Sequence, residues 1–284
     1  MNVDVNGVAR SVTVVGQPGH EGTRDLVLVF HGSRQNGQRH RAFTGNSYDR
    51  LAQQGAVVAY LDGYRGNWND ARRQSAFPTR LKGTDDMGFV RAVIDALVMS
   101  HGVDRRRVLA VGYSNGGQMV LRIIHEAPEL IAGAAVIAAT MPAPEDFLVP
   151  DAPAVPLPVL LVHGTKDPIV PYGGGEMSRW AQRVFKVGGR SLSMPETAAY
   201  FAGRNGISAA PVRTTVPGRD GGRRRTWVER TRYGQDGSAP VELYTVHGGG
   251  HTVPGPRSAP FVLGATTHDV STADLVSELF RPRD

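Results

Sequence analysis

Four short runs of consecutive apolar residues constrain the fold of this chain more than any other feature. They cover residues 26–30, 56–61, 108–111 and 159–162. A strand with one face in water alternates apolar and polar side chains, whereas an unbroken apolar run of this length is typical of a strand buried on both faces. Such strands occur mainly in parallel sheets covered by helices. The four runs therefore predict a largely parallel sheet at the centre of the molecule.

Segments with helical spacing lie between and after these runs. The clearest covers residues 84–100, in which Met87, Val90, Ile94 and Leu97 recur every three or four positions. A second segment follows Gly116, and a third covers residues 273–280. Because strands alternate with helices, the pattern predicts an α/β architecture with a doubly wound sheet.

Two further segments depart from this rhythm. Residues 3–15 alternate apolar and polar side chains around Asn6-Gly7, which predicts an antiparallel hairpin at a sheet edge. Residues 173–238 are rich in Gly, Arg and Pro, and we interpret them as an insertion that covers the active-site edge of the sheet. An ordinary helix with a surface hairpin is the alternative for that segment. Residues 1–284 as a whole are expected to form a single domain.

Composition and charge exclude several classes of function. The 284 residues include 32 Lys and Arg against 26 Asp and Glu, a net charge of +6, but the basic residues are scattered and nucleic acid is not expected as a partner. There is no cysteine, so disulfides, thiolate catalysis and cysteine-bound metals are excluded. No apolar stretch is long enough to span a membrane. The sequence shows no signal peptide, which suggests a cytoplasmic protein as written, or a secreted or periplasmic one if a leader was removed. It does not indicate an oligomeric state.

The strongest local motif surrounds Ser114. The pattern Gly112-x-Ser114-x-Gly116 stands between the buried run at 108–111 and the helical segment after it. A serine at such a sharp strand-to-helix turn is held in a strained conformation, and the flanking glycines leave out side chains that would collide with the neighbouring strand and helix. The motif predicts that Ser114 is a nucleophile of the α/β-hydrolase kind.

A nucleophilic serine needs a base and an acid that orients the base, and in this class they follow in the order Ser, Asp, His. Asp167 comes just after the run at 159–162, and it is the expected acid, with Asp146 and Asp151 as the alternatives. For the base, His251 lies beyond three glycines that allow a loop to bend across the sheet edge, whereas His247 still belongs to a strand. We favour His251. A metal site made by these two histidines is not expected, because the glycines prevent a helix between them and no third ligand is evident.

The developing oxyanion needs backbone donors. The amide of Asn115, at the start of the helix after Ser114, is the first expected donor. The second is expected in the loop 31–37, which follows the first buried run, and we name Ser33. Arg34 or Gln35 could occupy the same place.

Several motifs together resemble one known family. These are His31-Gly32, Trp68-Asn69 and residues 85–89, 112–117, 163–172 and 248–255. The chain resembles the branch of the α/β-hydrolases that contains polyhydroxybutyrate depolymerase-like and feruloyl esterase-like enzymes, including lipoprotein-type bacterial esterases. The resemblance implies an α/β-hydrolase fold, a triad of Ser114, Asp167 and His251, and no cofactor or metal. Four residues in or beside these motifs are the expected substrate-binding residues: Trp68, Tyr113, Tyr172 and Val253.

The sequence also departs from the family pattern. Val253 stands where the family commonly has a tryptophan two residues after the histidine, and the family is typically exported and often contains cysteine. Only about thirty residues follow His251, whereas members that digest solid polymer usually carry a polymer-binding domain. We therefore expect a serine carboxylic-ester hydrolase acting through an acyl-enzyme on small soluble esters, of feruloyl or acetyl type or hydroxyalkanoate oligomers. The alternatives are an acyltransferase or serine peptidase on the same fold, and a catalytically silent binding protein.

Overall fold

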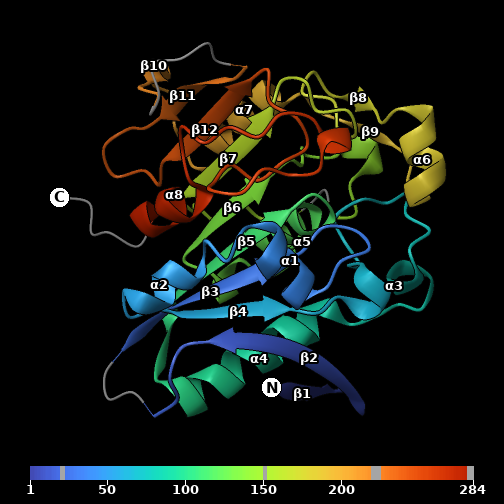
Figure 1. Cartoon of the computed structure of the whole chain (residues 1–284), viewed down its shortest axis with the longest axis vertical. Coiled ribbons are helices and arrows are strands. Elements are labelled where there is room, and N and C mark those ends of the chain that lie inside the picture. Colours follow the sequence, from blue (N-terminus) through green and yellow to red (C-terminus); the bar gives the residue numbers. More distant parts are fainter. Residues whose placement is uncertain (20–22, 150–151, 219–224, 280–284) are drawn as a thin grey trace.

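The computed structural model describes residues 1–19, 23–149, 152–218 and 225–279 and is organised around one large sheet (Figure 1). Ten strands follow in the order β1-β2-β4-β3-β5-β6-β7-β12-β11-β10. Their bounds are β1 Asn2–Val5, β2 Val8–Val15, β3 Arg24–Phe30, β4 Val57–Leu61, β5 Val103–Tyr113, β6 Gly133–Ile137, β7 Val159–Gly164, β10 Val212–Val216, β11 Trp227–Tyr233 and β12 Val241–His247. The six central strands, from β4 to β12, are parallel, and two antiparallel strands extend the sheet on each side.

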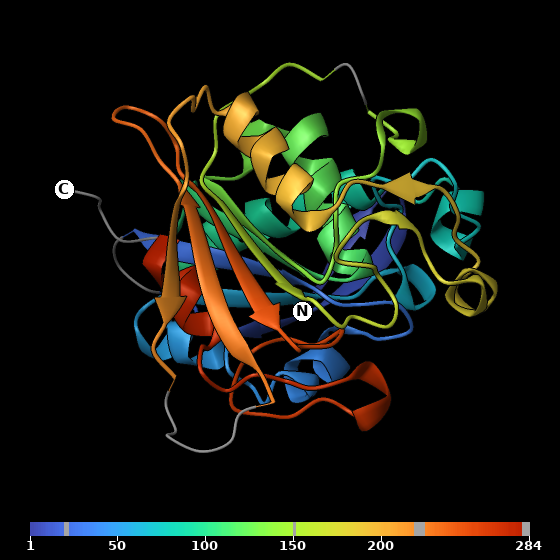
Figure 2. The same ribbon diagram turned by 90° about the horizontal axis from the view of Figure 1, so that it is seen from above.

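Helices cover both faces of this sheet, as Figure 2 shows. On one face lie α4 Asp86–His101, α5 Asn115–Glu126 and α7 Met194–Arg204. On the other lie α1 Gly37–Phe43, α2 Asp49–Gln53 and α8 Thr272–Leu279. Two helices lie away from the sheet, α3 Pro78–Leu81 and α6 Arg179–Phe185, and 3₁₀ turns occur at Tyr64–Gly66, Pro128–Leu130, Pro144–Asp146 and Phe261–Leu263.

The apolar runs form the centre of the sheet because each of these strands buries side chains on both of its faces. In β3, Leu28 and Phe30 face the core under α4 and α5, whereas Val27 and Val29 face the core under α2 and α8. All four of these side chains are buried. The predicted doubly wound, mostly parallel sheet is thereby confirmed. The sequence analysis did not identify β6, although its five residues are also entirely buried.

The N-terminal hairpin is confirmed as well. Strands β1 and β2 pair antiparallel around the Asn6-Gly7 turn, where both residues have positive φ, and β1 is an edge of the sheet. The helix expected over residues 84–100 is α4, and the Asp85 side chain caps its N-terminus by accepting a hydrogen bond from the Gly88 amide.

The stretch 173–238 contains two different parts. Its first part forms a small separate sheet from β8 Gly175–Glu176 and β9 Arg190–Ser191, with α6 between them. Its second part joins the main body, because α7 packs on β7 and β12, and β10 and β11 extend the large sheet. The part that stands apart from the main sheet is therefore limited to the segment from β8 to β9.

Among the described residues, no helix has both the length and the hydropathy needed to cross a lipid bilayer.

Candidate active site

Ser114 lies at a tight turn between β5 and α5. Its backbone has φ 54° and ψ −116°, and its amide donates to the carbonyl of Ile137 at 2.8 Å. A Cβ atom at Gly112 would lie 2.2 Å from the carbonyl oxygen of Gly116, and one at Gly116 would lie 2.1 Å from that of Phe30. These positions therefore require glycine, as the motif predicted, and the backbone places the serine at the carboxyl edge of the parallel strands.

His251 links Ser114 to Asp167. Its Nε2 lies 2.9 Å from Ser114 Oγ, and its Nδ1 lies 2.7 Å from Asp167 Oδ2. With Asp167 ionised, Nδ1–H donates to the carboxylate, and Nε2 is left to accept the serine hydroxyl. The backbone of His251 is also fixed, because its amide donates to the carbonyl of Leu263 and its carbonyl accepts from the hydroxyl of Tyr113. The loops after β5, β7 and β12 thus meet at one edge of the sheet.

Asp167 is a fully buried carboxylate that several donors stabilise. Its Oδ1 accepts the amides of Ile169 and Val170, each at 2.8 Å, and His163 Nε2 lies 3.3 Å from Oδ2. Burial by itself disfavours the charged form, but the charge of His251 and the hydrogen bonds from His163 and His251 outweigh it and lower the pKa of the carboxyl. The carboxylate is therefore ionised beside the imidazole.

The alternative acids and the alternative base lie elsewhere. The Asp146 carboxylate accepts from Gln74 Nε2 and from the amide of Arg190, each at 2.7 Å. Asp151 lies outside the described residues. The ring of His247 stacks on Trp227 with 3.7 Å between centroids. Geometry thus brings Asp167 and His251, rather than these residues, to Ser114.

Two backbone amides near Ser114 are available for an oxyanion. Of the three candidates in the loop after β3, Arg34 and Gln35 use their amides on the carbonyls of Gly66 and Gly32, at 2.8 and 3.3 Å. Within the part of the chain that the structure describes, the amides of Ser33 and Asn115 donate to no protein acceptor. Ser33, Asn115 and Ser114 line the same pocket. The pattern of occupied donors therefore favours Ser33 over its two neighbours.

Buried polar contacts hold this loop rigidly. His31 Nε2 accepts the amide of Gly63 at 2.9 Å, and the carbonyl of His31 accepts Trp68 Nε1–H at the same distance. Burial lowers the pKa of His31 to about 4, so its ring stays neutral and can serve as that acceptor. Gln35 Oε1 accepts the amide of Gly32, whose missing Cβ makes room for the ring of Tyr113.

The four residues expected to bind substrate have other neighbours in this structure. Trp68 is fully buried, and Tyr113 and Val253 are almost so, as parts of the core. The hydroxyl of Tyr172 is hydrogen-bonded to that of Thr245 at 2.8 Å. None of these four lines the pocket beside Ser114. Their contact with substrate stays a prediction, and Trp68 and Tyr113 clearly support the loops that carry the site.

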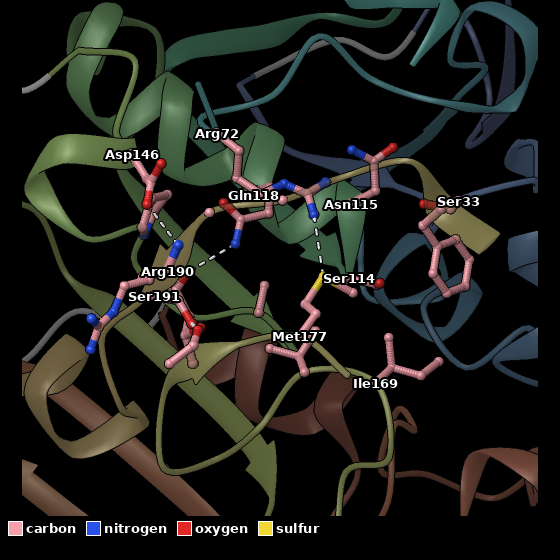
Figure 3. A pocket seen from close by; sticks show the side chains of 18 of the residues that line it. Ser33, Arg72, Ser114, Asn115, Gln118, Asp146, Ile169, Met177, Arg190 and Ser191 are labelled. Atoms are coloured by element: carbon pink, nitrogen blue, oxygen red, sulfur yellow. Dashed lines mark hydrogen bonds between the residues drawn. The ribbon is translucent and has the colours of Figure 1, made fainter. Parts of the chain in front are cut away.

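A pocket that opens to solvent lies beside Ser114 (Figure 3). Its apolar walls include Phe77, Ile169, Val170, Met177 and Phe185, and its polar walls include Arg72, Gln118, Thr140 and Arg190. Several of these belong to the segment from β8 to β9, which lies across the pocket. His251 is not among the lining residues. The residues that line this pocket, apart from Ser33, Ser114, Asn115 and Asp146, were not predicted from the sequence. Neither was the contact of His163 with Asp167, although His163 belongs to the motif at residues 163–172.

No cluster of three or more His, Asp or Glu that could hold a metal ion occurs among the residues described.

The chain is similar in sequence to known esterases. Residues 74–191 match the family model described as Phospholipase/Carboxylesterase. The chain is 32% identical to "Putative esterase NocK" of Nocardia uniformis subsp. tsuyamanensis, over 95% of this chain and 81% of that protein. It is 28% identical to Feruloyl esterase B of Piromyces equi, over 85% of this chain but only 42% of that protein.

A solved structure is similar over nearly the whole chain. Acetyl xylan esterase from Aspergillus awamori superposes with a TM-score of 0.58, and the match covers 95% of this chain and 93% of that one. At 16% sequence identity this likeness shows the fold alone, which is the α/β-hydrolase fold expected from the sequence.

Proposed function

Because the chain belongs to the α/β-hydrolase esterases represented by NocK, it is a carboxylic-ester hydrolase, and we propose that Ser114, His251 and Asp167 are its catalytic triad. The observation that carries the proposal is the unbroken hydrogen-bonded series from Ser114 Oγ through His251 to Asp167, at 2.9 and 2.7 Å. The low pKa of Asp167 supports it, because an ionised carboxylate fixes the tautomer in which Nε2 can accept a proton.

In the proposed mechanism, His251 Nε2 takes the proton of Ser114 as Oγ attacks the ester carbonyl carbon. The carbonyl π electrons move to oxygen, and the amides of Ser33 and Asn115 donate to that oxyanion. Collapse of the tetrahedral intermediate breaks the bond to the alcohol oxygen, which receives the proton from His251. Water, deprotonated by His251, then attacks the acyl-enzyme, and the acid leaves as Ser114 recovers its proton.

The position of the pocket indicates which half of the ester it holds. The leaving alcohol must lie near His251 Nε2, because that atom protonates it. The pocket contains Ser114, Asn115 and Ser33 but not His251, so it extends on the other side of the nucleophile. We therefore assign it to the acyl group, and the segment from β8 to β9 is the cap that closes it.

The substrates that we propose are small soluble esters with a short or aromatic acyl group. The walls of Phe77, Met177 and Phe185 suit the apolar part of an acyl chain. Two similar proteins are named for feruloyl and acetyl xylan esters, which supports acyl groups of these kinds. Hydroxyalkanoate oligomers remain part of the proposal because their acyl units are equally short.

The replacement Ser114→Ala tests the nucleophile. We expect kcat for 4-nitrophenyl butyrate to fall by on the order of 10⁶, because the remaining groups cannot form the acyl-enzyme. Thermal unfolding should show that the variant is folded. Acetyl, feruloyl and 3-hydroxybutyrate esters, measured with the wild-type enzyme, rank the acyl groups. Hydrolysis by the variant at close to the wild-type rate would refute the triad.

A further inference from the structure

Arg72 is an unusual wall for an acyl pocket. Its guanidinium lines the same pocket as Ser114, and only 14% of its side chain is exposed. In Figure 3 the guanidinium points across the pocket toward Met177. A largely buried cation is costly unless an anion or several acceptors satisfy it.

One carboxylate fixes the position of Arg72 relative to the proposed oxyanion site. The carboxylate of Asp70 is fully buried. Its Oδ1 accepts from Arg72 Nε at 3.3 Å, and its Oδ2 accepts from Arg72 Nη2 at 2.5 Å. The same Oδ2 atom accepts Asn115 Nδ2–H, also at 2.5 Å. Arg72 is therefore separated by a single carboxylate from the residue that follows the nucleophile.

The Asp70 bond occupies only one edge of the guanidinium. Nη1 has a single partner among the described residues, the sulfur of Met177 at 4.0 Å. A thioether is a weak acceptor on a flexible side chain, and a ligand can displace it. Nη1 and the second proton of Nη2 thus form a free pair of donors with the spacing that a carboxylate accepts.

The surroundings of Arg72 carry an excess of positive charge. Arg80 donates to the carbonyls of Asp70 and Arg72 and has no carboxylate within 4 Å in the described part of the chain, whereas Arg10 is paired with Asp86 and Arg122 with Glu126. Arg72 and Arg80 therefore share the charge of one carboxylate, that of Asp70. Burial and the nearby charges of Arg122 and Arg72, opposed by Asp70, lower the pKa of Arg80, as expected where cations outnumber anions.

The carboxylate of Asp146, which also lines the pocket, forms no ion pair with Arg72 in the described part of the chain. Both of its oxygens already accept hydrogen bonds, from Gln74 and from the amide of Arg190. Figure 3 shows it on the far side of Gln118 from the Arg72 guanidinium.

We propose that Arg72 is a specificity-determining residue that binds a carboxylate carried by the acyl group. The preferred substrates are then monoesters of short dicarboxylic acids, whose free carboxylate lies on the open edge of Arg72 while the ester carbonyl lies at Ser114. This inference rests on the assignment of the pocket to the acyl group, and it adds the chemical class of that group.

The test compares two esters of nearly equal shape, monoethyl succinate and ethyl succinamate, by titrating released acid at constant pH. We expect wild-type kcat/KM to be higher for the anionic ester. Arg72→Gln should lower kcat/KM for monoethyl succinate roughly 10- to 100-fold, the usual effect of losing a charge-assisted hydrogen bond, mainly through KM. In the same variant, kcat/KM for ethyl succinamate should change less than about threefold. Arg72→Lys should recover part of the lost kcat/KM for monoethyl succinate.

Two further variants separate binding from folding and from net charge. Met177→Glu would place a carboxylate against Nη1 from a half-buried position, and should remove the preference for the anionic ester without disturbing Asp70. Arg91→Gln removes a positive charge from the exposed surface of α4, and should leave both rates unchanged. If Arg72→Gln reduces both esters equally, Arg72 only supports Asp70 and Asn115, and the proposal is wrong.

A binding measurement keeps this test independent of the proposed nucleophile. Monoethyl succinate should bind Ser114→Ala in calorimetry, and should bind Ser114→Ala with Arg72→Gln at least tenfold more weakly. Equal affinities, or binding to neither protein, would overturn the role of Arg72. Retained hydrolysis by Ser114→Ala would instead overturn the triad and would leave the calorimetric result to decide on Arg72.

Discussion

At the scale of single residues, Asp167 shows how a buried charge is made useful. Its carboxylate is buried away from water. Two backbone amides donate hydrogen bonds to Oδ1 in place of water, and two histidines face Oδ2. These contacts lower the pKa of the carboxyl although burial would raise it. The amides orient the carboxylate, and the carboxylate in turn orients His251.

Replacing Asp167 by Asn should therefore keep the geometry and lose the charge. The amide of Asn can still accept the bonds from Ile169 and Val170, but it favours the wrong tautomer of His251, and in comparable triads this costs on the order of 10⁴ in kcat. We expect His251→Ala to be impaired further. Steady-state hydrolysis of 4-nitrophenyl butyrate measures both. Full activity of both variants would contradict the roles assigned to these residues.

Stability should respond to Asp167 in a defined direction. Because its pKa is lower in the folded state, the ionised carboxyl adds to the free energy of unfolding above its unfolded pKa of about 4, and this contribution disappears as the pH falls through the lowered folded value. The difference in the free energy of urea unfolding between the wild type and Asp167→Asn should therefore be constant from pH 7 to about pH 5, and should shrink as the pH falls below about 4. A difference that stays constant down to about pH 3 would contradict this linkage.

At the scale of elements, the turn from β5 to α5 leaves no room for side chains at Gly112 and Gly116. Strand, turn and helix approach so closely that Gly116 lies against the backbone of β3, at the carbonyl of Phe30. The strained φ of Ser114 persists because β5 and α5 are both packed in the core and leave the turn no alternative.

Gly116→Ala should consequently separate β3 from α5. Its Cβ would lie 2.1 Å from the carbonyl oxygen of Phe30, so we expect a loss of several kcal/mol in the free energy of unfolding, together with loss of esterase activity. The matched control is Gly203→Ala in α7, where a Cβ meets nothing within 4 Å and the change should stabilise by up to about 1 kcal/mol. Thermal unfolding of the two variants measures this difference. Equal stability of Gly116→Ala and Gly203→Ala would contradict the close packing of Gly116 on β3.

At the scale of the whole molecule, buried neutral histidines are distributed around the sheet. His31 follows β3, His40 lies in α1, and His125 lies in α5 on the opposite face. Burial lowers the pKa of His31 and His125 to about 4 and that of His40 to about 3. All three rings accept or donate hydrogen bonds in their neutral form, as His125 does with the carbonyl of Leu121 and the hydroxyl of Tyr200.

These histidines should make the protein sensitive to mild acid. Their folded pKa values lie below the unfolded value of 6.5, so the unfolded chain binds protons first and stability is lost as the pH falls from about 6.5 toward 4. At pH 5 each contributes about 2 kcal/mol to this loss. Urea unfolding at pH 7.5 and 5.0 measures the difference, and His125→Gln should reduce it. Equal stability at both pH values would contradict the prediction.

Features that depend on neighbours along the chain could be predicted from the order of the amino acids. Unbroken apolar runs marked the central strands, because both faces of those strands must be buried. The glycines around Ser114 marked the turn, since its backbone conformation excludes side chains there. The order of Ser114, Asp167 and His251 followed from where the successive strands end. Strands β10 and β11 were harder to recognise, because β10 is largely exposed and the flanking segment resembles a loop in composition.

Which of several plausible groups meet depends on how the whole chain packs. This packing placed Asp167 rather than Asp146 at His251, and it left the amide of Ser33 free while those of its two neighbours are bonded. It also joined Arg72 to Asn115 through Asp70. Such contacts connect residues that are far apart along the chain, and each depends on distances of a few tenths of an ångström. Composition, spacing and periodicity carry no information at that resolution, so the choice belongs to the packed molecule.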